Sequence, residues 1–387
     1  MTKVLLHILS CLVILLNSGD LLSQSLSDLS FGTDSTFDVV TWNIEWFPKN
    51  GSTTVDSVGK IIEFLDADLI GLQEIDDTTL CREMVNEIDD YDLFMDYVWF
   101  GGLAYIYKTS SIQIQSIYKI YDTAPYWNIF PRSPLVMELT YLGEKIIAIN
   151  NHFKCCGDGL IDMGNTSDEE FRRYEANVLL KQYIDANFPT DRVILMGDLN
   201  DEITDAIPNN VFQMLLNDST NYLFADYTIA NGSSTDWSFP SWPSHLDHIL
   251  ITNELFTEFS NSGSGIQTIM VDNFMSGGFS NYDFYISDHR PVGMKVKINP
   301  NTASLNGINK PSISVTPNPT NGQLFIDLTL LKGELTMKVL DVYGRMVHLL
   351  HCQGNQLLEF NFDGQAGIYF LIAESDHNQF VVKFMKK

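Results

Sequence analysis

Short apolar runs that end in polar side chains recur along the first three quarters of the chain. The clearest is Val193–Asn200, in which four apolar residues run into a glycine that is followed by Asp198 and Asn200. Such a run predicts a buried strand, and residues two apart on a strand point to the same side. Asp198 and Asn200 are therefore expected to face one water molecule or ligand, although such residues also commonly make a turn after a strand.

Three other segments repeat this pattern of an apolar run that stops at a polar side chain. They are Asp38–Asn43, Asp68–Glu74 and Lys145–His152. Apolar residues at helical spacing lie between them, first over Val55–Leu65 and then over Ser167–Asn187. Strand and helix periods that alternate in this way predict an α/β domain.

The second of these helices has a predicted N-terminus and a predicted inner face. Ser167 is the expected N-cap because Glu170 follows three residues later, the spacing of a capping box. The side chains expected to face the core are Phe171, Tyr174, Val178, Leu179, Tyr183 and Ile184.

Two later segments place acidic and histidine side chains beside strands. The apolar segment Leu246–Thr252 contains Asp247 near its start. The segment Ile286–Ile298 carries Asp288 and His289 in the turn before an alternating strand. These polar groups are further candidates for the rim of the same sheet.

The character of the sequence changes after the last of these strands. Residues 299–310 have the composition of a linker. Residues 311–387 contain short alternating strands and Asn-Gly or Asp-Gly turns, which predict a small separate all-β sandwich. The main domain is therefore expected over residues 31–298.

The N-terminus has the layout of a secretory signal peptide. One lysine, a short apolar run and small residues follow one another, and cleavage is expected near Ser23–Gln24, so that residues 1–23 are removed. A lipoprotein signal ending at Cys11 is the alternative, but that cysteine lies inside the apolar run. No other stretch is long enough for a membrane helix, so stable membrane insertion is not expected.

Composition limits the classes of partner. The net charge of −26 over 387 residues makes a long basic groove along nucleic-acid phosphates an unfavourable arrangement. Phosphate chemistry in this chain should be local and assisted by a cation.

The cysteines that remain after signal cleavage offer a disulfide. In an oxidising exported environment Cys81 is expected to pair with Cys155 or Cys156, which leaves one of the three over. A metal site is the alternative, but the spacings match no zinc pattern.

The polar groups at the strand ends form a chemically coherent set. Carboxylates Glu74 and Asp288 and the amide oxygen of Asn43 are hard ligands that suit Mg²⁺. Two histidines near acidic residues add proton transfer and charge stabilisation. Together they predict metal-assisted hydrolysis of a phosphate ester. The full set is Asn43, Glu74, Arg132, His152, Asp198, Asn200, Asp247, Asp288 and His289.

These residues lie in motifs that resemble the endonuclease/exonuclease/phosphatase superfamily, which includes deoxyribonuclease I. The motifs follow the family's order over roughly residues 36–298: Trp-Asn43, Gln-Glu74, Phe-Pro-Arg132-Ser-Pro, Asn-His152-Phe, Gly-Asp198-Leu-Asn200, Leu-Asp247-His-Ile and Ser-Asp288-His289-Arg-Pro-Val. The resemblance implies a four-layer α/β sandwich of two packed, largely antiparallel sheets.

The resemblance also implies a role for each residue. Glu74 would bind the divalent ion with Asn43 and Asp288 nearby, where Mg²⁺ is expected, Mn²⁺ is an alternative and Ca²⁺ could be structural. Asp198 would position or deprotonate the attacking water, and Asn200 would hold Asp198 or the phosphate.

The remaining residues would act on the phosphate and the leaving group. His289, oriented by Asp247, would stabilise charge on the phosphate, which Arg132 would grip. His152 would be the general acid. Its acidic partner is not evident, and Asp96 is a guess from position alone.

The C-terminal stretch resembles the sorting domain of the type IX secretion system. The resemblance rests on Val-Thr-Pro317-Asn-Pro319, Val-Tyr-Gly344-Arg, Gly367-Ile-Tyr-Phe-Leu and the terminal Val-Lys-Phe-Met-Lys-Lys. It implies outer-membrane secretion machinery as a partner and a secreted or cell-surface location. An appended glycan-binding β-sandwich is the alternative.

Three functions are compatible with these motifs. The first is an extracellular endonuclease or exonuclease acting on DNA or RNA, expected to be a monomer. The second is a sphingomyelinase-like or inositol-phosphate-type phosphatase or phosphodiesterase, because the same motifs serve small and lipid phosphates. The third is a non-catalytic surface binding protein, which the complete set of acid, base and metal positions argues against.

Overall fold

The computed structural model describes residues 25–96, 101–299, 314–329, 333–341, 345–374 and 379–387. The chain divides into two compact units, Met1–Pro300 and Asn301–Lys387. The proposed signal peptide, residues 1–23, lies outside the described residues, as do residues 300–310 of the proposed linker.

The first unit contains two six-stranded sheets whose strand orders correspond. The first sheet runs β11 (Gly265–Thr268), β12 (Val292–Val296), β1 (Phe37–Phe47), β2 (Leu69–Ile75), β4 (Gly102–Lys108) and β3 (Tyr91–Met95). The second runs β5 (Ile112–Lys119), β6 (Leu135–Tyr141), β7 (Glu144–His152), β8 (Arg192–Asp198), β10 (Asp247–Thr252) and β9 (Tyr222–Phe224).

Each sheet has one parallel pair at its centre, and its other pairs are antiparallel. The parallel pairs are β1 with β2 and β7 with β8. A parallel pair needs a crossover, which is α1 (Ser52–Leu65) in the first sheet and α3 (Glu169–Asn187) in the second. Because parallel strands end at the same sheet edge, these two pairs deliver their last residues to one rim each.

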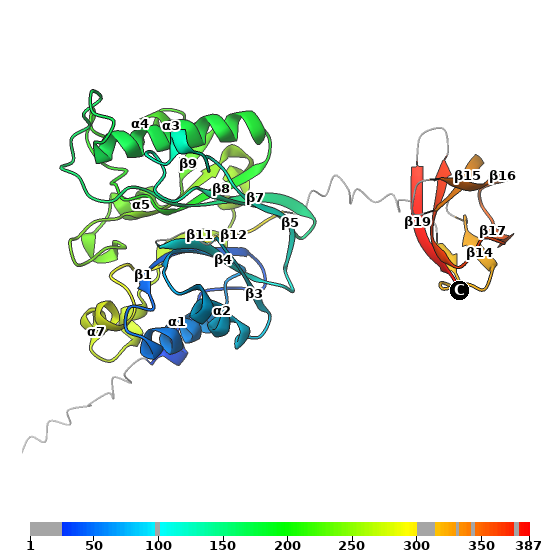
Figure 1. Cartoon of the computed structure of the whole chain (residues 1–387), viewed down its shortest axis with the longest axis horizontal. Coiled ribbons are helices and arrows are strands. Elements are labelled where there is room, and N and C mark those ends of the chain that lie inside the picture. The colour runs from blue at the N-terminus through cyan, green and yellow to red at the C-terminus, as the bar shows by residue number, and fades with distance from the viewer. Residues whose placement is uncertain (1–24, 97–100, 300–313, 330–332, 342–344, 375–378) are drawn as a thin grey trace, which may run out of the picture. The chain divides into compact units, whose positions relative to one another are not determined.

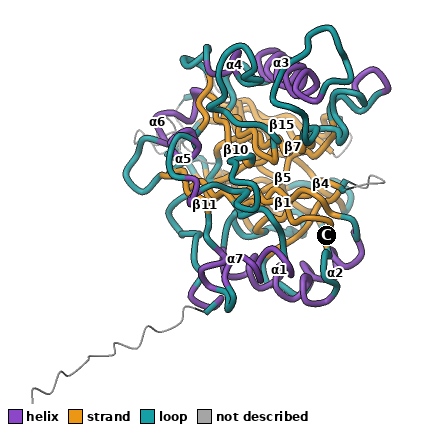
Figure 2. The backbone as a smooth tube through the Cα atoms, turned by 90° about the vertical axis from the view of Figure 1, so that its left-hand side faces the viewer, coloured by secondary structure: helices purple, strands orange, loops and turns teal. Residues whose placement is uncertain are grey.

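The two sheets pack face to face with helices outside, which gives four layers (Figure 1). Helices α1, α2 (Thr78–Asn86) and α7 (Gly278–Tyr285) cover the first sheet, and α3 and α4 (Gln213–Leu216) cover the second. The view in Figure 2 shows the same layering from the side. The expected four-layer α/β sandwich is thereby confirmed.

Short elements complete the connections of this unit. They are η1 (Leu26–Asp28), η2 (Ala124–Tyr126), η3 (Ser234–Asp236), η4 (Asn253–Leu255), η5 (Val271–Phe274), α5 (Tyr227–Ala230) and α6 (Phe256–Phe259). None of the described helices is long and apolar enough to cross a membrane.

Three apolar clusters correspond to the three interfaces between layers. The central one joins inward-facing residues of both sheets, such as Val39 and Leu69 from the first and Met137 and Ile194 from the second. Alternate residues of these strands face the central cluster and the residues between them face a helix layer, so the strands are buried on both faces and appear in the sequence as continuous apolar runs. The packed apolar interior holds the strand ends in place, and the polar groups lie at these strand ends.

The N-terminus and inner face of α3 differ from the sequence prediction. Asp168, not Ser167, is the N-cap, and its side chain accepts from the backbone N of Phe171 at 2.7 Å. The buried positions of α3 are Glu170, Arg173, Ala176, Asn177, Leu180 and Ile184. Of the predicted stripe only Ile184 is fully buried, because charged Glu170 and Arg173 occupy the inner face near the helix start and bind the neighbouring loops.

The predicted disulfide is not formed. Cys81 is a buried free thiol in the apolar cluster between the first sheet and its helices, whereas Cys155 and Cys156 are exposed free thiols in the loop after β7. Burial raises the pKa of the Cys81 thiol to about 12, so this sulfur is protonated and inert at neutral pH. Cys81 is a core residue.

The second unit contains only strands among its described elements. A three-stranded sheet has the order β13 (Ser314–Thr316), β14 (Gln323–Asp327) and β17 (Leu357–Asn361). A four-stranded sheet has the order β16 (Met346–Gln353), β15 (Glu334–Asp341), β18 (Gly367–Glu374) and β19 (Gln379–Lys386). Their inner faces share one apolar cluster that includes Leu324, Met337 and Leu371, as expected for a small β-sandwich.

Candidate active site

Three candidate residues form a single row across neighbouring strands of the second sheet. His152 ends β7 and is the register partner of Asp198, which ends β8, and Asp198 is in turn the partner of Asp247 at the start of β10. Residues paired in this way point to the same face. All three are almost completely buried, with exposed fractions of 3%, 1% and 0%.

A glycine makes this row possible. Gly197 precedes Asp198 and has a φ of +149°, and a Cβ at this position would lie 2.0 Å from the carbonyl oxygen of Asn151. Only glycine allows β7 and β8 to approach so closely next to the site. The close approach of the two strands therefore explains why the first residue of the Gly-Asp-Leu-Asn motif is glycine.

The first sheet contributes Asn43 from β1 and Glu74 from β2. Asn43 Nδ2 donates to Glu74 Oε1 at 3.1 Å and to Asp198 Oδ2 at 2.9 Å, so one amide links the two sheets. The pairing of β1 and β2 shifts register after Asn43, and Glu74 has a φ of +63°. Bulges and positive φ values concentrate at functional sites, where they aim side chains that a regular strand would misdirect.

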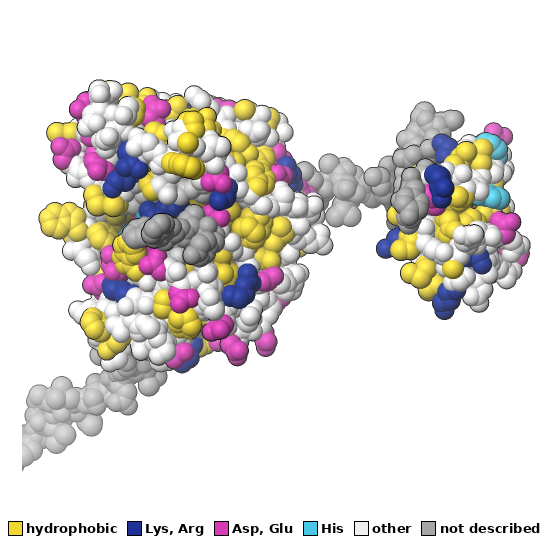
Figure 3. Space-filling view, viewed as in Figure 1, with side chains coloured by type: hydrophobic (Ala, Val, Ile, Leu, Met, Phe, Trp, Pro, Cys, Tyr) yellow, Lys and Arg dark blue, Asp and Glu magenta, His cyan; other side chains and the backbone are white. Residues whose placement is uncertain are grey.

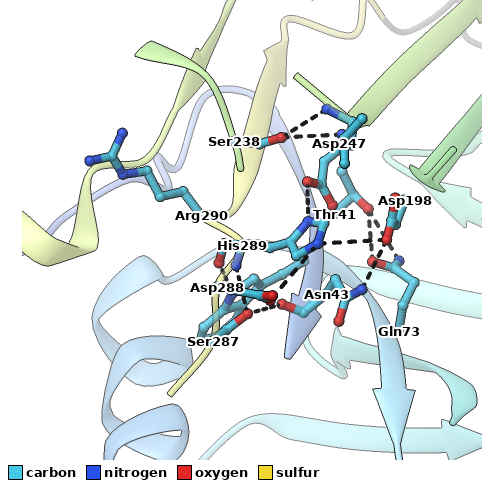
Figure 4. A network of polar contacts seen from close by, with 12 residues as sticks. Thr41, Asn43, Gln73, Asp198, Ser238, Asp247, Ser287, Asp288, His289 and Arg290 are labelled. Carbon is cyan, nitrogen blue, oxygen red and sulfur yellow. Dashed lines mark hydrogen bonds and ion pairs between the residues drawn. The ribbon is translucent and has the colours of Figure 1, made fainter. Parts of the chain in front are cut away.

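His289 reaches the row from the turn before β12. Its Nδ1 lies 2.7 Å from Asp247 Oδ2, and its Nε2 lies 3.8 Å from Asp198 Oδ2 and 3.9 Å from Asp288 Oδ1. The ring of Phe239 lies 4.8 Å from the imidazole, centroid to centroid. Figure 4 shows His289 and Asn43 directed toward Asp198, while the Arg290 side chain points away.

The turn that carries His289 is fixed by hydroxyl and backbone groups. Ser287 Oγ donates to the carbonyl oxygen of Asn43 at 2.7 Å and accepts from the backbone N of His289 at 2.9 Å. Tyr282 and Trp42 both donate to the carbonyl oxygen of His289, at 2.6 and 3.1 Å. The turn that carries His289 is thus held by β1 and α7 before any ligand binds.

An open cavity of about 280 Å³ adjoins this cluster. It is lined by Trp46, Glu74, Pro131, Arg132, His152, Lys154 and Cys155. Arg132 Nε donates to the carbonyl oxygen of Gly101 at 3.2 Å, which holds the guanidinium at the wall. The cavity therefore combines two cationic side chains with the Glu74 carboxylate and His152.

Burial and neighbouring charge set the protonation of the acidic row. Burial raises the pKa of Asp198 to about 7, and the Asp247 and Glu74 carboxylates push in the same direction against His289 and the Asn43 amide. Burial alone would lower the pKa of His289, but the Asp247 and Asp198 carboxylates outweigh it and hold that pKa well above the ordinary value. His289 is therefore an imidazolium at neutral pH.

The surroundings of His152 lower its pKa, whereas those of His289 raise it. Burial, and then the positive charges of Arg132 and His289, hold its pKa well below the ordinary value. Its Nε2 lies 3.5 Å from Asp198 Oδ2 and 3.7 Å from Glu74 Oε1, and its Nδ1 is buried without a hydrogen-bond partner among the described residues. Asp96 is not that partner, because it pairs with Lys119 at 3.3 Å.

The residues present fit a hard divalent cation. Three carboxylates, Glu74, Asp198 and Asp288, lie at the rim, and the Asn43 amide directs its Nδ2 to the first two while its Oδ1 accepts from the backbone N of Glu45 at 2.9 Å. Burial raises the pKa of Asp198, neighbouring carboxylates add to that rise, and a cation would relieve the repulsion among these carboxylates. Ligand atoms of Asp198, Asp247 and His289 also lie within 4.8 Å of one another. Because His289 is charged and bonded to Asp247, the carboxylate oxygens are the better donors.

All nine residues singled out in the sequence lie at this rim or its adjoining cavity. Asn200 differs from expectation in detail: its backbone N donates to Asp198 Oδ1 at 3.0 Å, but its side chain donates to the carbonyl oxygen of Phe153 at 3.3 Å. The backbone of Asn200 thus holds the Asp198 carboxylate, and its side chain supports the loop after β7.

Sequence reasoning missed several supporting residues. Glu45 Oε2 accepts from the backbone N of Asp288 at 2.8 Å and pairs with Lys49. Ser238 Oγ accepts from the backbone N of Asp247 at 3.2 Å. Glu45 has a φ of +32° and lies where the pairing of β1 shifts register, so strand alternation does not place it, and Ser238 is brought in by a distant loop that gives no local signal.

A second buried histidine cluster lies behind the row. Asp226 Oδ2 is 2.6 Å from His248 Nδ1 and 3.1 Å from His245 Nε2, and all three side chains are completely buried. His248 Nε2 lies 2.9 Å from the carbonyl oxygen of Asp201. His248 is therefore not a rim residue; it ties the loop after Asp198 to the strand that carries Asp247.

Comparison with known proteins matches this geometry to a family. Residues 40–289 match the model of the endonuclease/exonuclease/phosphatase family, and residues 314–387 match that of a secretion system C-terminal sorting domain. None of the curated proteins searched matches the chain.

Solved structures share the fold at low sequence identity. D. rerio TDP2 complexed with a single-strand DNA product is 14% identical with a TM-score of 0.51, over 68% of this chain and 100% of that one. An endonuclease/exonuclease/phosphatase from Bacteroides vulgatus is also 14% identical with a TM-score of 0.50, over 68% of this chain and 99% of that one. These likenesses establish the fold and leave the substrate open.

The family match covers more than half of the chain and contains every residue of the polar rim. Members of this family are metal-dependent phosphoesterases, and the C-terminal match directs the chain to secretion or to the cell surface. The chain belongs to the endonuclease/exonuclease/phosphatase family and carries a secretion-system sorting domain at its C-terminus.

Proposed function

We propose that this protein is a secreted Mg²⁺-dependent nuclease that hydrolyses phosphodiester bonds in DNA or RNA. The observation that carries the proposal is the meeting of Asp198 with Asn43, His152 and His289 at the rim of two sheets, beside an open cavity that contains Arg132. This arrangement offers a base, a fixed imidazolium and a phosphate-binding cation around one space.

In this proposal the protein's own groups have separate tasks. Asp198, with a pKa of about 7, accepts the proton of the attacking water near neutral pH. His289, held by Asp247, stabilises the negative charge that develops on the phosphate. Arg132 binds a phosphate oxygen, and Asn200 fixes the Asp198 carboxylate through its backbone N.

His152 requires the substrate before it can act as an acid. It is neutral in the ligand-free site because burial and two cations lower its pKa. A phosphate anion in the cavity would raise that pKa again, so His152 gains its proton when substrate is bound and donates it to the leaving oxygen.

Glu74, Asn43 and Asp288 would hold the divalent ion. Mg²⁺ is the proposed occupant because the donors are all hard oxygens, and Mn²⁺ would serve in its place. The ion would supply charge neutralisation at the phosphate. We also propose that the protein can bind a separate structural Ca²⁺, which metal analysis of the purified protein would detect.

The exposed aromatic side chain beside the cavity favours a nucleic acid over a small phosphate. Trp46 lines the cavity with 42% of its surface exposed, and an exposed indole is a stacking platform for a base. The distribution of surface charge favours the alternative substrate, a small or lipid phosphate. On the face visible in Figure 3, acidic and basic side chains of the described residues are mixed and do not form a basic stripe. We therefore expect local contacts with few phosphates and a shallow dependence of affinity on salt.

The proposed route is export by a signal peptide of residues 1–23 and delivery by the sorting domain. We assign the catalytic domain to residues 31–298, the linker to residues 299–310 and the sorting domain to residues 311–387. Outer-membrane secretion machinery is the proposed partner of the last part, and the secreted enzyme is proposed to be a monomer.

The test is a substrate panel with the purified full-length chain in Mg²⁺, Mn²⁺ and chelator. We expect cleavage of duplex DNA, single-stranded DNA or RNA that stops in chelator and returns with Mg²⁺. Hydrolysis of sphingomyelin or inositol phosphates with intact nucleic acid would replace the nuclease proposal by the alternative. Undiminished cleavage in chelator would contradict metal dependence, and a lack of hydrolysis across the panel would favour a binding protein.

A matched pair of variants ties the activity to the site. Trp46→Ala should raise KM for nucleic acid without reducing cleavage of a small chromogenic phosphodiester, because the indole contacts the base and not the phosphate. Trp127→Ala is the control, since Trp127 is also exposed, at 60%, but does not line the cavity.

A further inference from the structure

The loop after β7 places two adjacent cysteines at the wall of the candidate site. Cys155 lines the cavity with Arg132 and His152, and Cys156 follows it in the chain. Both side chains are exposed free thiols, and their Sγ atoms lie 2.9 Å apart, with Cys156 donating to Cys155. Among the described residues no other two cysteines are in contact, since Cys352 Sγ contacts Met337 Sδ and Cys81 lies in the apolar core.

A buried arginine holds the backbone of this cysteine pair. Arg173 is 3% exposed, and its Nη1 donates to the carbonyl oxygens of Lys154 and Cys156, both at 2.7 Å. Its Nε donates to Asp201 Oδ2 at 2.7 Å, and its Nη2 lies 3.2 Å from Glu170 Oε1. The two carbonyls on either side of the pair are therefore fixed by one side chain anchored in the core.

The backbone conformation of Cys156 depends on this anchor. Cys156 has a φ of +70°, which a residue with a side chain seldom adopts. Such conformations persist where the surroundings impose them, and they cluster at functional sites. In this conformation the two sulfur atoms lie on the same side of the loop, 2.9 Å apart.

We propose that Cys155 and Cys156 form a reversible disulfide between neighbouring residues at the wall of the cavity, a redox-sensitive modification site in the secreted protein. A bond between adjacent residues joins Cα atoms only about 3.8 Å apart, closer than in ordinary disulfides, so it is strained and readily reduced. Strained, exposed disulfides are the labile ones. The inference does not depend on the proposed nuclease reaction.

The oxidant is a low-molecular-weight disulfide such as oxidised glutathione. Cys155 Sγ, which lies 3.6 Å from Lys154 Nζ, gives up its proton to water and attacks one sulfur of the oxidant. The other sulfur of the oxidant leaves as a thiolate and takes up a proton to become the first thiol. The Cys156 thiolate, after losing its proton to water, attacks Cys155 Sγ, closes the ring and releases the second thiol. The pair loses two hydrogens, and one disulfide is reduced to two thiols.

The pair can be isolated in one peptide. Trypsin cleavage after Lys154 and Arg172 releases residues 155–172, which contain Cys155 and Cys156 and no other cysteine. The full-length protein is equilibrated with mixtures of reduced and oxidised glutathione, quenched in acid, unfolded, alkylated with N-ethylmaleimide and digested. Mass spectrometry then reads the state of both thiols together.

In oxidising mixtures we expect an unlabelled peptide lighter than the dithiol by two hydrogen atoms, and in reducing mixtures a doubly labelled peptide. Cys352→Ser should not change this result, and Cys155→Ser should leave Cys156 as a mixed disulfide with glutathione. Double labelling in the most oxidising mixture would overturn the proposal. So would a link from this peptide to Cys81, to Cys352 or to a second chain, or glutathione retained on both thiols.

Discussion

Asp247 Oδ2 lies 2.7 Å from His289 Nδ1, although the two residues come from different sheets and lie 42 positions apart in the chain. Asp247 begins β10 in the second sheet, and His289 precedes β12 in the first. The contact fixes the imidazole with Nε2 toward Asp198. The carboxylate thus both orients the ring and keeps it charged.

Replacing Asp247 by Asn tests this contact. The amide keeps the shape but removes the negative charge, so the pKa of His289 should fall and the imidazolium should be lost at lower pH. We expect turnover at neutral pH to fall by about 10²- to 10⁴-fold, the range for loss of a positioned acid–base partner. The measurement is the pH profile of kcat, in which the alkaline limb should move to lower pH.

Asp56→Asn, an exposed position on α1, is the control and should leave the profile unchanged. Near-normal turnover of Asp247→Asn, with a circular dichroism spectrum like that of the parent, would contradict the role given to His289.

The raised pKa of Asp198 predicts a pH-dependent stability. Its value is about 7 in the folded protein against 3.8 in an ordinary aspartate, so between these values the folded state binds more protons than the unfolded state. Stability from this group is therefore present at low pH and falls as pH rises toward 7. Asp198→Asn should abolish this pH-dependent loss of unfolding free energy. The loss is at most a few kcal/mol, at about 1.4 kcal/mol per pKa unit.

Urea unfolding of both proteins in chelator from pH 4 to 8 measures the difference. Added Mg²⁺ should lower the pKa of Asp198 and flatten the pH dependence of the parent alone, and its removal should restore the slope. Parallel curves for parent and variant in chelator would show that Asp198 does not have a raised pKa.

The buried pair of Asp226 and His248 makes a second stability prediction. Burial would raise the pKa of Asp226, but His248 and His245 hold it well below the ordinary value, while Asp226 raises the pKa of His248 against the effect of burial. Asp226→Asn leaves the histidine without its counter-charge and should cost about 3–5 kcal/mol of unfolding free energy. Asp185→Asn, which breaks an exposed pair with Lys181 but keeps an oxygen to accept from the Tyr222 hydroxyl, should cost about 1 kcal/mol or less.

The sign of the pH dependence follows from both shifts. The lowered pKa of Asp226 gives stability that is present above its unfolded pKa and lost as pH falls, and the raised pKa of His248 gives stability that is lost as pH rises through its folded pKa. The difference between parent and Asp226→Asn should therefore be largest in mildly acidic solution, between about 4 and about 6.5. A difference that grows steadily above neutral pH would contradict the charged pair.

Removal of the second unit should separate delivery from catalysis. Deleting residues 311–387 removes a unit with its own apolar core, so the first unit should keep its kcat and KM. Secretion should be lost, as measured by the amount of protein outside intact cells. Fusion of residues 311–387 to an exported carrier protein is the reciprocal control, and secretion of the truncated chain at the parental level would contradict the sorting assignment.

The sequence by itself determined which segments become strands and which residues end them. Runs such as Val193–Asn200 have no other stable place than a buried strand, because their apolar side chains need cover on both faces. Ordered motifs then identified Asp198, His289 and their companions as one set. These are local properties of the sequence, so they do not depend on how the two sheets pack.

Tertiary structure alone decided how the two sheets meet and what their contacts do to charge. The neutral state of His152, the arginine that anchors Cys155 and Cys156, and the buried aspartate beside His248 all depend on groups far apart in the chain. The sequence around a residue does not identify such neighbours, because burial and Coulomb interactions depend on distances in space. For the same reason Cys81 cannot reach the cysteines with which its spacing had paired it, since it packs between the first sheet and its helices.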